Sequence, residues 1–158
     1  MNAASFPSVI TLLTLDRIRV DAAVSSRDEL FQMVAALFAS EELSEKEIAR
    51  ALKAREALAS TALGHGVAIP HGRIKGLLDA RTAFFRTAQP IAFNAPDGKK
   101  VSLFFILLVP EHATEYHLKL LAELAQMTND HQFREALRDA PNANVVCDLL
   151  KRQAVLDV

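Results

Sequence analysis

The sequence predicts an α/β fold in which a mixed β-sheet lies between helices, as a three-layer sandwich. Apolar residues recur at helical spacing between about residues 26 and 58, strand-like segments follow as far as residue 109, and helical spacing returns after Pro110. Because helices and strands are grouped in runs, we expect a mixed sheet flanked by helices and not a strictly alternating, doubly wound fold.

The chain has 158 residues, 51% of them hydrophobic and 23% charged, which is enough to bury one core without metals or disulfides. We therefore expect a single domain over residues 1–158, in which residues 1 to about 13 form a loosely held arm. The 18 basic and 19 acidic side chains nearly cancel, so nucleic-acid binding is not expected. Cys147 has no partner for an internal disulfide and stands among apolar neighbours, which predicts a buried position in a helix.

The amino terminus has neither a basic leader nor a small-residue cleavage site, so we do not expect export. The longest apolar run, residues 101–109, falls well short of the ~20 residues that a membrane span needs. A cytoplasmic protein without membrane insertion is the resulting prediction.

Two capping boxes predict the first two helices. Residues 26–29 (SRDE) precede a helix to about residue 40, and residues 44–47 (SEKE) precede a second one. The inward face of the first helix is predicted to hold Leu30, Phe31, Val34, Leu37 and Phe38, and that of the second Ile48, Ala51 and Leu52.

The middle of the chain has the pattern of strands. Residues 67–69 (VAI) form a short strand that ends at residues 70–72 (PHG), so we expect His71 to enter a turn. Residues 80–89 and 102–109 predict two more strands, the second apolar enough to be buried on both faces, with a turn at Asp97 and Gly98. Helical spacing then returns in Leu118, Leu121, Leu124 and Ala125, and again in residues 133–137 and 145–150.

Two polar residues stand where the helical spacing predicts apolar ones. Arg55 follows Leu52 by three residues and ends the inward face of the second helix, and His117 precedes Leu121 by four in the first turn of a later helix. Arg55 is either a snorkelling side chain at a helix end or a clamp for an anion. His117 is either a satisfied core histidine or part of a site beyond a strand's carboxyl end, where phosphates bind in layered folds.

His71, between Pro70 and Gly72, is the candidate nucleophile. A neutral imidazole can attack phosphorus with one nitrogen while the other donates a hydrogen bond that sets the tautomer. Phosphoryl transfer then needs mainly positioning and charge stabilisation, which Arg55 and His117 could supply if the fold brings them to His71. The hydroxyls of Ser60 and Thr61 could contact a phosphate or simply bond the backbone.

Other kinds of site have weaker support. No GxGxxG or GxxxxGK[ST] pattern occurs, so we do not expect a bound nucleotide or another cofactor. The histidines at positions 65, 71 and 117 lack HExxH or paired-cysteine spacing, so we do not expect a metal, and His112 and His131 are predicted to lie on the surface.

Residues 55–72 (REALASTALGHGVAIPHG) resemble the phosphorylation-site motif of the fructose/mannitol-type enzyme IIA family of the phosphotransferase system, especially its nitrogen-regulatory branch. The resemblance extends to residues 90–93 (PIAF), 107–110 (LLVP) and 116–118 (YHL), and covers about residues 8 to 150. It implies a mixed sheet between helical layers and a phosphoryl group accepted by His71, on Nε2, from an HPr-like carrier. It also implies active-site roles for Arg55 and His117.

One position departs from the family pattern, because His65 stands between two glycines where members often carry Asn or Glu. We expect His65 to face solvent. The resemblance leaves three functions open. The chain could regulate target proteins, such as potassium-transport or sensor proteins, through its phosphorylation state; it could pass phosphate to an enzyme IIB partner in sugar uptake; or it could be a binding module in which His71 is vestigial.

Overall fold

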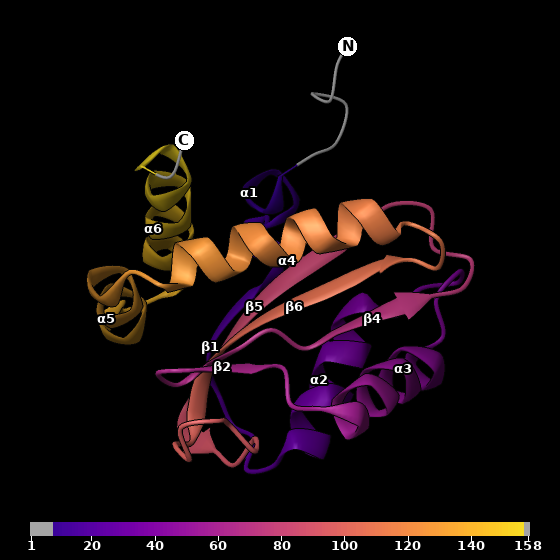
Figure 1. The fold of residues 1–158 in the computed structure, drawn as a ribbon, viewed down its shortest axis with the longest axis horizontal. Coiled ribbons are helices and arrows are strands. Elements are labelled where there is room, and N and C mark those ends of the chain that lie inside the picture. Colours follow the sequence, from indigo (N-terminus) through magenta and orange to yellow (C-terminus); the bar gives the residue numbers. More distant parts are fainter. Residues whose placement is uncertain (1–7, 157–158) are drawn as a thin grey trace.

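The computed structural model describes residues 8–156, which form a mixed six-stranded sheet with helices on both faces (Figure 1). The strands are β1 (Ile18–Ala22), β2 (Ala62–Gly64), β3 (Val67–Ala68), β4 (His71–Ile74), β5 (Arg81–Ile91) and β6 (Val101–Pro110). The helices are α1 (Val9–Leu12), α2 (Arg27–Phe38), α3 (Glu45–Leu58), α4 (Thr114–Thr128), α5 (His131–Asp139) and α6 (Ala143–Leu156), with a 3-10 turn, η2, at Leu15–Arg17.

The sheet is built around the two long strands, in the order β1-β5-β6-β3-β2, with β4 also paired to β6. β5 runs antiparallel to β6, whereas β1 is parallel to β5, and both β3 and β4 are parallel to β6. Apolar side chains cover β6 on both faces, as its sequence predicts.

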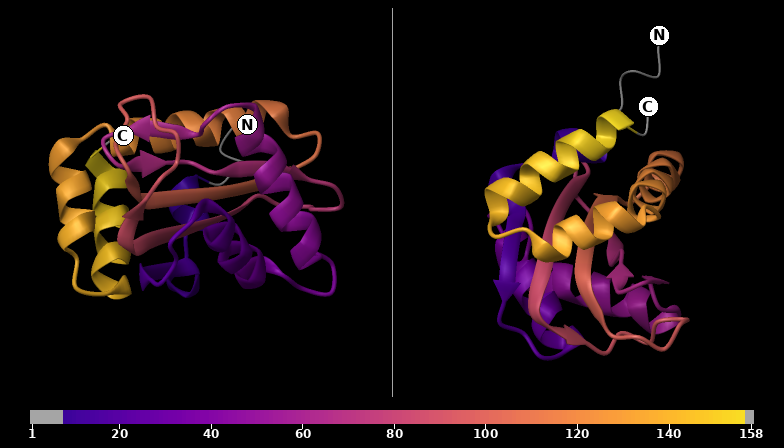
Figure 2. Two further views of the ribbon diagram at one scale, coloured as in Figure 1. Left: turned by 90° about the horizontal axis from the view of Figure 1, so that it is seen from below. Right: turned by 90° about the vertical axis from the view of Figure 1, so that its left-hand side faces the viewer.

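Two hydrophobic clusters pack on opposite faces of the sheet. Phe85, Phe104 and Ile106 lie in the cluster with α2 and α3, whereas Phe84 and Phe105 lie in the cluster with α1, α4, α5 and α6. Figures 1 and 2 show α2 and α3 on one side of the strands and α4 on the other. The predicted three-layer α/β/α fold with a mixed sheet is therefore confirmed.

Both predicted capping boxes begin helices. The Ser26 hydroxyl accepts the Glu29 N–H at 3.2 Å, and the Glu29 carboxylate accepts the Ser25 N–H at 2.8 Å. At the start of α3, the Ser44 hydroxyl accepts the Glu47 N–H at 3.3 Å. These caps satisfy amides that have no partner within the helix, which is why short polar sequences fix where α2 and α3 begin.

The predicted turn at His71 is wrong, because His71 is the first residue of strand β4. The chain stays close to β6 after β3: the Leu107 N–H donates to the Pro70 carbonyl at 3.0 Å, and His71 pairs with Leu107. Pro70 has no N–H to donate, so the hydrogen bonding between the strands is interrupted there, but the chain continues alongside β6. The long apolar β6 therefore pairs with β3 and β4 in succession.

Three smaller predictions also need correction. The prediction of a loosely held arm is wrong from residue 9 onward, because α1 contacts α4 and α6, and Val9 and Leu13 are buried. Residues 1–7 lie outside the described part of the chain. In α4 the buried face holds His117, Leu120, Leu124 and Met127, whereas Leu118 is 61% exposed. Spacings of three and four residues select that face, and Leu118 lies about 100° around the helix from it. Cys147 is in a helix, α6, but is only half-buried.

Candidate functional site

His71, Arg55 and His117 come together from three different elements. His71 begins β4, Arg55 lies in the last turn of α3, and His117 lies in the first turn of α4. The Arg55 Nε–H donates to His71 Nε2 at 3.2 Å, and the ring centroids of His71 and His117 are 5.0 Å apart with planes at 68°. The sheet therefore brings a helix from each of its two faces to the same strand end.

The hydrogen bonds of His71 assign its tautomer. Nδ1 lies 2.7 Å from the Ile69 carbonyl, which can only accept, so Nδ1 carries the proton. Nε2 is then unprotonated and accepts the Arg55 Nε–H. Burial lowers the pKa of His71, the Ile69 hydrogen bond opposes this, and the positive charges of Arg55 and Arg73 lower the pKa further. The ring is therefore neutral at neutral pH, with a lone pair on Nε2.

Arg55 is held in place by the end of its own helix. Its Nη1 donates to the carbonyl of Ala59, the C-cap residue of α3, at 2.8 Å, and its Nε is the donor to His71. The side chain is half-buried, and it turns toward His71 instead of snorkelling into solvent. Two nitrogens of one planar group thus have separate fixed partners, which a lysine could not reproduce.

His117 is a buried imidazole whose hydrogen-bonding capacity is unused. It is 7% exposed, and within the described residues neither ring nitrogen has a hydrogen-bond partner. Burial lowers its pKa to about 4, with further contributions from His71 and the charges of Arg73 and Arg55. It is therefore not the satisfied core histidine of the first interpretation. Its nitrogens are available to a ligand atom placed between the two rings.

The remaining candidates lie outside this arrangement. The Ser60 hydroxyl donates to the Phe93 carbonyl at 2.7 Å, and the Thr61 hydroxyl donates to Glu56 at 2.8 Å, so both bond to the protein itself. His65 is exposed, as expected, and its N–H donates to Asp97 at 2.8 Å. His112 and His131 are also exposed. Among residues 8–156, no group of three His, Cys, Asp or Glu side chains is placed to hold a metal ion.

Two residues near the site were missed by the sequence reasoning. Glu56 is 6% exposed and follows Leu52 by four residues, so the same helical spacing that selected Arg55 also places Glu56 on the buried face of α3. Arg73 contributes positive charge to both imidazoles from β4, two residues after His71. Alternation along β4 puts His71 and Arg73 on one face, but local signals predicted a turn at His71, so this alternation could not be used from the sequence.

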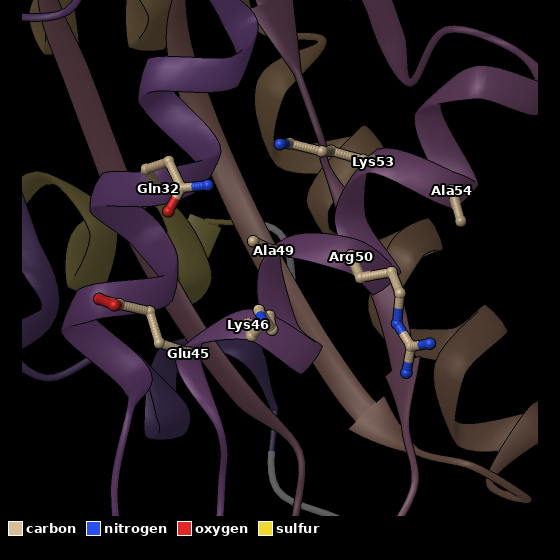
Figure 3. Close-up of a pocket in the computed structure, with 7 residues that line it drawn as sticks. All are labelled: Gln32, Glu45, Lys46, Ala49, Arg50, Lys53 and Ala54. Atoms are coloured by element: carbon tan, nitrogen blue, oxygen red, sulfur yellow. The ribbon is translucent and has the colours of Figure 1, made fainter.

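Two hollows bordered by α3 are lined by basic side chains with some acidic ones among them. The first lies between α2 and α3 and includes Lys46, Arg50 and Lys53 (Figure 3). The second lies between α3 and β4, with Arg50, Arg73 and Lys75 among its lining residues. The predicted site residues line neither hollow, so these surfaces are separate from the site.

The chain belongs to the family described as "Phosphoenolpyruvate-dependent sugar phosphotransferase system, EIIA 2", whose model matches residues 11–153. A nitrogen regulatory protein of Pseudomonas aeruginosa is 39% identical over 141 residues, covering 88% of this chain and 92% of that relative. The crystal structure of nitrogen regulatory protein IIA-Ntr from Neisseria meningitidis is 45% identical, with a TM-score of 0.86 over 90% of this chain and 98% of that one.

A third relative is specific for a sugar. The fructose-specific EIIA component of Haloferax volcanii is 37% identical over 100 residues, covering 63% of this chain and 65% of that protein. The predicted resemblance to the enzyme IIA family and its nitrogen-regulatory branch is thus confirmed. In the part of the chain that the structure describes, no helix has the length and apolar character to cross a membrane.

Proposed function

We propose that the protein is a phosphoryl carrier that accepts a phosphoryl group on His71 Nε2 from an HPr-like phosphocarrier protein and regulates target proteins according to its phosphorylation state. The observation that carries the proposal is the arrangement of His71. Its Nδ1–H is bound to the Ile69 carbonyl, and its Nε2 lone pair points toward the Arg55 guanidinium. A nucleophile, its orienting acceptor and a cation are thus in hydrogen-bonding contact.

The transfer can be written as a direct displacement. The lone pair of His71 Nε2 forms a new N–P bond as the N–P bond of the donor's phosphohistidine breaks, and the donor nitrogen keeps that electron pair. The donor ring leaves as a neutral imidazole if its other nitrogen is protonated. The His71 ring gains positive charge while Nδ1 keeps its proton, and the Ile69 carbonyl, 2.7 Å from Nδ1, stabilises that charge.

Arg55 and His117 have different roles in this proposal. The Arg55 Nε–H shifts from Nε2 to a phosphoryl oxygen, which offsets the negative charge brought by the donor. His117 is a neutral ring beside the acceptor, and an N–H of that ring can donate to another phosphoryl oxygen. The residues around His71 thus supply positioning and charge stabilisation, which are the main requirements of phosphoryl transfer.

Regulation follows from the charge that the phosphoryl group adds. The positive charges of Arg55 and Arg73 act on the ring of His71. A phosphoryl group at His71 adds about two negative charges beside them and changes which partner surface the protein can bind. Potassium-transport and sensor proteins are the kinds of target that we propose, and the nitrogen regulatory relatives support a regulatory role in general.

The direct test is transfer of labelled phosphate from a charged HPr-like donor to purified protein. We expect labelling of the wild type and of His112→Ala, which removes an exposed histidine outside the site. We expect none in His71→Ala. Equal labelling of His71→Ala would exclude His71 as the acceptor. Absence of label in the wild type, with a donor that labels another enzyme IIA, would favour a binding module instead.

A second candidate function is enzyme IIA of a fructose- or mannitol-type uptake system, which would pass the phosphoryl group to enzyme IIB. The similarity to the fructose-specific component of Haloferax volcanii favours it. Rapid transfer of label from phosphorylated protein to an enzyme IIB domain of the same organism would support this function over regulation. Retention of the label, with target binding that differs between the two forms, would support regulation.

A further inference from the structure

Glu56 is a buried carboxylate that joins the end of α3 to the start of β2. Its Oε2 accepts the Thr61 N–H at 2.7 Å, and its Oε1 accepts the Thr61 hydroxyl at 2.8 Å. Both oxygens thus bind one residue, and the connection between Leu58, the last residue of α3, and Ala62, the first of β2, is closed by these bonds. Hydrogen bonds to an ionised acceptor are the stronger kind, so Thr61 is firmly placed.

The bonds of Thr61 continue to the proposed acceptor histidine. The Thr61 carbonyl accepts the Ile69 N–H at 3.1 Å, and the Ile69 carbonyl accepts the His71 Nδ1–H at 2.7 Å. His71 Nε2 then accepts the Arg55 Nε–H, and Arg55 directly precedes Glu56 in α3. These hydrogen bonds therefore link Glu56 to Arg55, its neighbour in the same turn of α3, through Thr61, Ile69 and His71.

A carboxylate at this position is costly to bury unless its hydrogen bonds are made. Glu56 is 6% exposed, and no ion pair of the described residues includes it. Burial raises the pKa of Glu56, and the bonds from Thr61 only partly oppose this. An apolar residue would avoid the cost of desolvating a charge, but it would leave the buried Thr61 N–H and hydroxyl without their acceptor, so Glu56 and Thr61 depend on each other.

We propose that Glu56 is a positioning residue for His71: through Thr61 it holds the Ile69 carbonyl where that carbonyl fixes the His71 ring with Nδ1 protonated and Nε2 free to react. The role in transfer rests on the proposed function, whereas the role in setting the tautomer does not. Orientation by a buried carboxylate that does not touch the reacting atoms is a recurring way to prepare an imidazole.

The test reads the tautomer directly, by long-range nitrogen–proton correlation NMR of the His71 ring in the unphosphorylated protein near neutral pH. We expect the wild type to show protonated Nδ1 and unprotonated Nε2. Glu56→Ala should shift His71 toward the Nε2–H form. Glu56→Gln should keep the wild-type pattern, because an amide can accept the Thr61 N–H with its oxygen and donate to the hydroxyl with its nitrogen. Glu45→Ala removes an exposed carboxylate from the same helix and is the matched control.

Transfer rates complete the test. Glu56→Ala should accept label about 10- to 100-fold more slowly than the wild type, with rescue in Glu56→Gln, because small errors in orientation are costly in such reactions. If Glu56→Ala does not fold, Thr61→Val, which loses only the hydroxyl bond, should show the same changes to a smaller degree. An unchanged tautomer in the folded variants would overturn the proposal even if transfer slowed. Failure of the wild type to accept label would overturn the proposed function. The tautomer measurement would still decide whether Glu56 positions the His71 ring.

Discussion

Replacing His117 with leucine should stabilise the protein and impair it at the same time. Within the described residues neither ring nitrogen of His117 has a hydrogen-bond partner, and the side chain is 7% exposed. An unsatisfied buried polar group costs about 1–3 kcal/mol. Leucine has no such group, so at pH 7 we expect the free energy of unfolding to rise by about 1–2 kcal/mol after a small repacking cost.

The difference in stability between His117→Leu and the wild type should become larger in acid. The pKa of His117 is about 4 in the folded protein, against an ordinary value of 6.5. As the pH falls from about 6.5 to about 4, the unfolded chain binds a proton at this residue and the folded protein does not, so acid favours unfolding. The wild-type protein therefore has its full stability above about pH 6.5, and it loses stability as the pH falls from about 6.5 to about 4. At pH 4.5 the loss amounts to about 2.5 kcal/mol, which the leucine variant escapes.

Urea unfolding followed by far-ultraviolet circular dichroism measures both effects, since the chain has no tryptophan to report by fluorescence. The leucine variant should exceed the wild type by about 1–2 kcal/mol at pH 7 and by about 4 kcal/mol at pH 4.5. His112→Leu, at an exposed position, controls for the loss of a histidine. A difference between His117→Leu and the wild type that stays constant between the two pH values would refute the reasoning. Phosphoryl transfer in the variant should fall about 100-fold.

Three further substitutions probe the site and its frame. Arg55→Lys should slow label transfer at least ~10-fold, because one ammonium cannot contact the acceptor ring and the helix-end carbonyl together; a wild-type rate would contradict this. Gly66→Ala should cost about 1–2 kcal/mol in urea unfolding, because φ is +78°, whereas the end of the flexible Arg138 side chain, 2.6 Å from the new Cβ, can shift at little cost. Gly76→Ala, with φ of +87° and open space, should cost about the same, so a much larger loss in Gly66→Ala would show that the contact with Arg138 also matters. Arg86→Met should cost about 3 kcal/mol by the same assay, because three carbonyls near the end of α5 lose their donor in bonds of which two are buried and one is partly buried; a loss below about 1 kcal/mol would show that other groups satisfy them.

Much of the fold could be predicted because local signals agree with the tertiary structure. Ser26 and Ser44 cap the helices that their capping boxes predicted, and the apolar residues of β6 face both layers. The start of β4 could not be predicted from local signals. Pro70 and Gly72 favour a turn when read alone, whereas pairing with Leu107 of β6 keeps the chain extended. A contact distant in the sequence overrode the local preference.

The placement of the candidate site residues was partly foreseeable. Arg55 and His117 could be selected because the helical period puts them on otherwise apolar faces, and the structure brings both to His71. The Ile69 carbonyl could not be foreseen, because every residue carries a carbonyl and only its position distinguishes this one. The helical period also places Glu56 on the buried face of its helix. Its partner Thr61 lies beyond the end of that helix, where helical spacing no longer predicts the path of the chain, so their contact could not be predicted.

The two imidazoles of this site share one energetic property. The lowered pKa of His71 and of His117 makes the folded state less stable in acid, and the unpaired nitrogens of His117 cost stability at neutral pH as well. The same burial keeps both imidazoles neutral and leaves the nitrogens of His117 available where a phosphoryl group would bind. If the proposed function is correct, the phosphoryl oxygens supply the partners that the unmodified protein lacks, so the cost in stability and the capacity to hold phosphate arise from the same side chains.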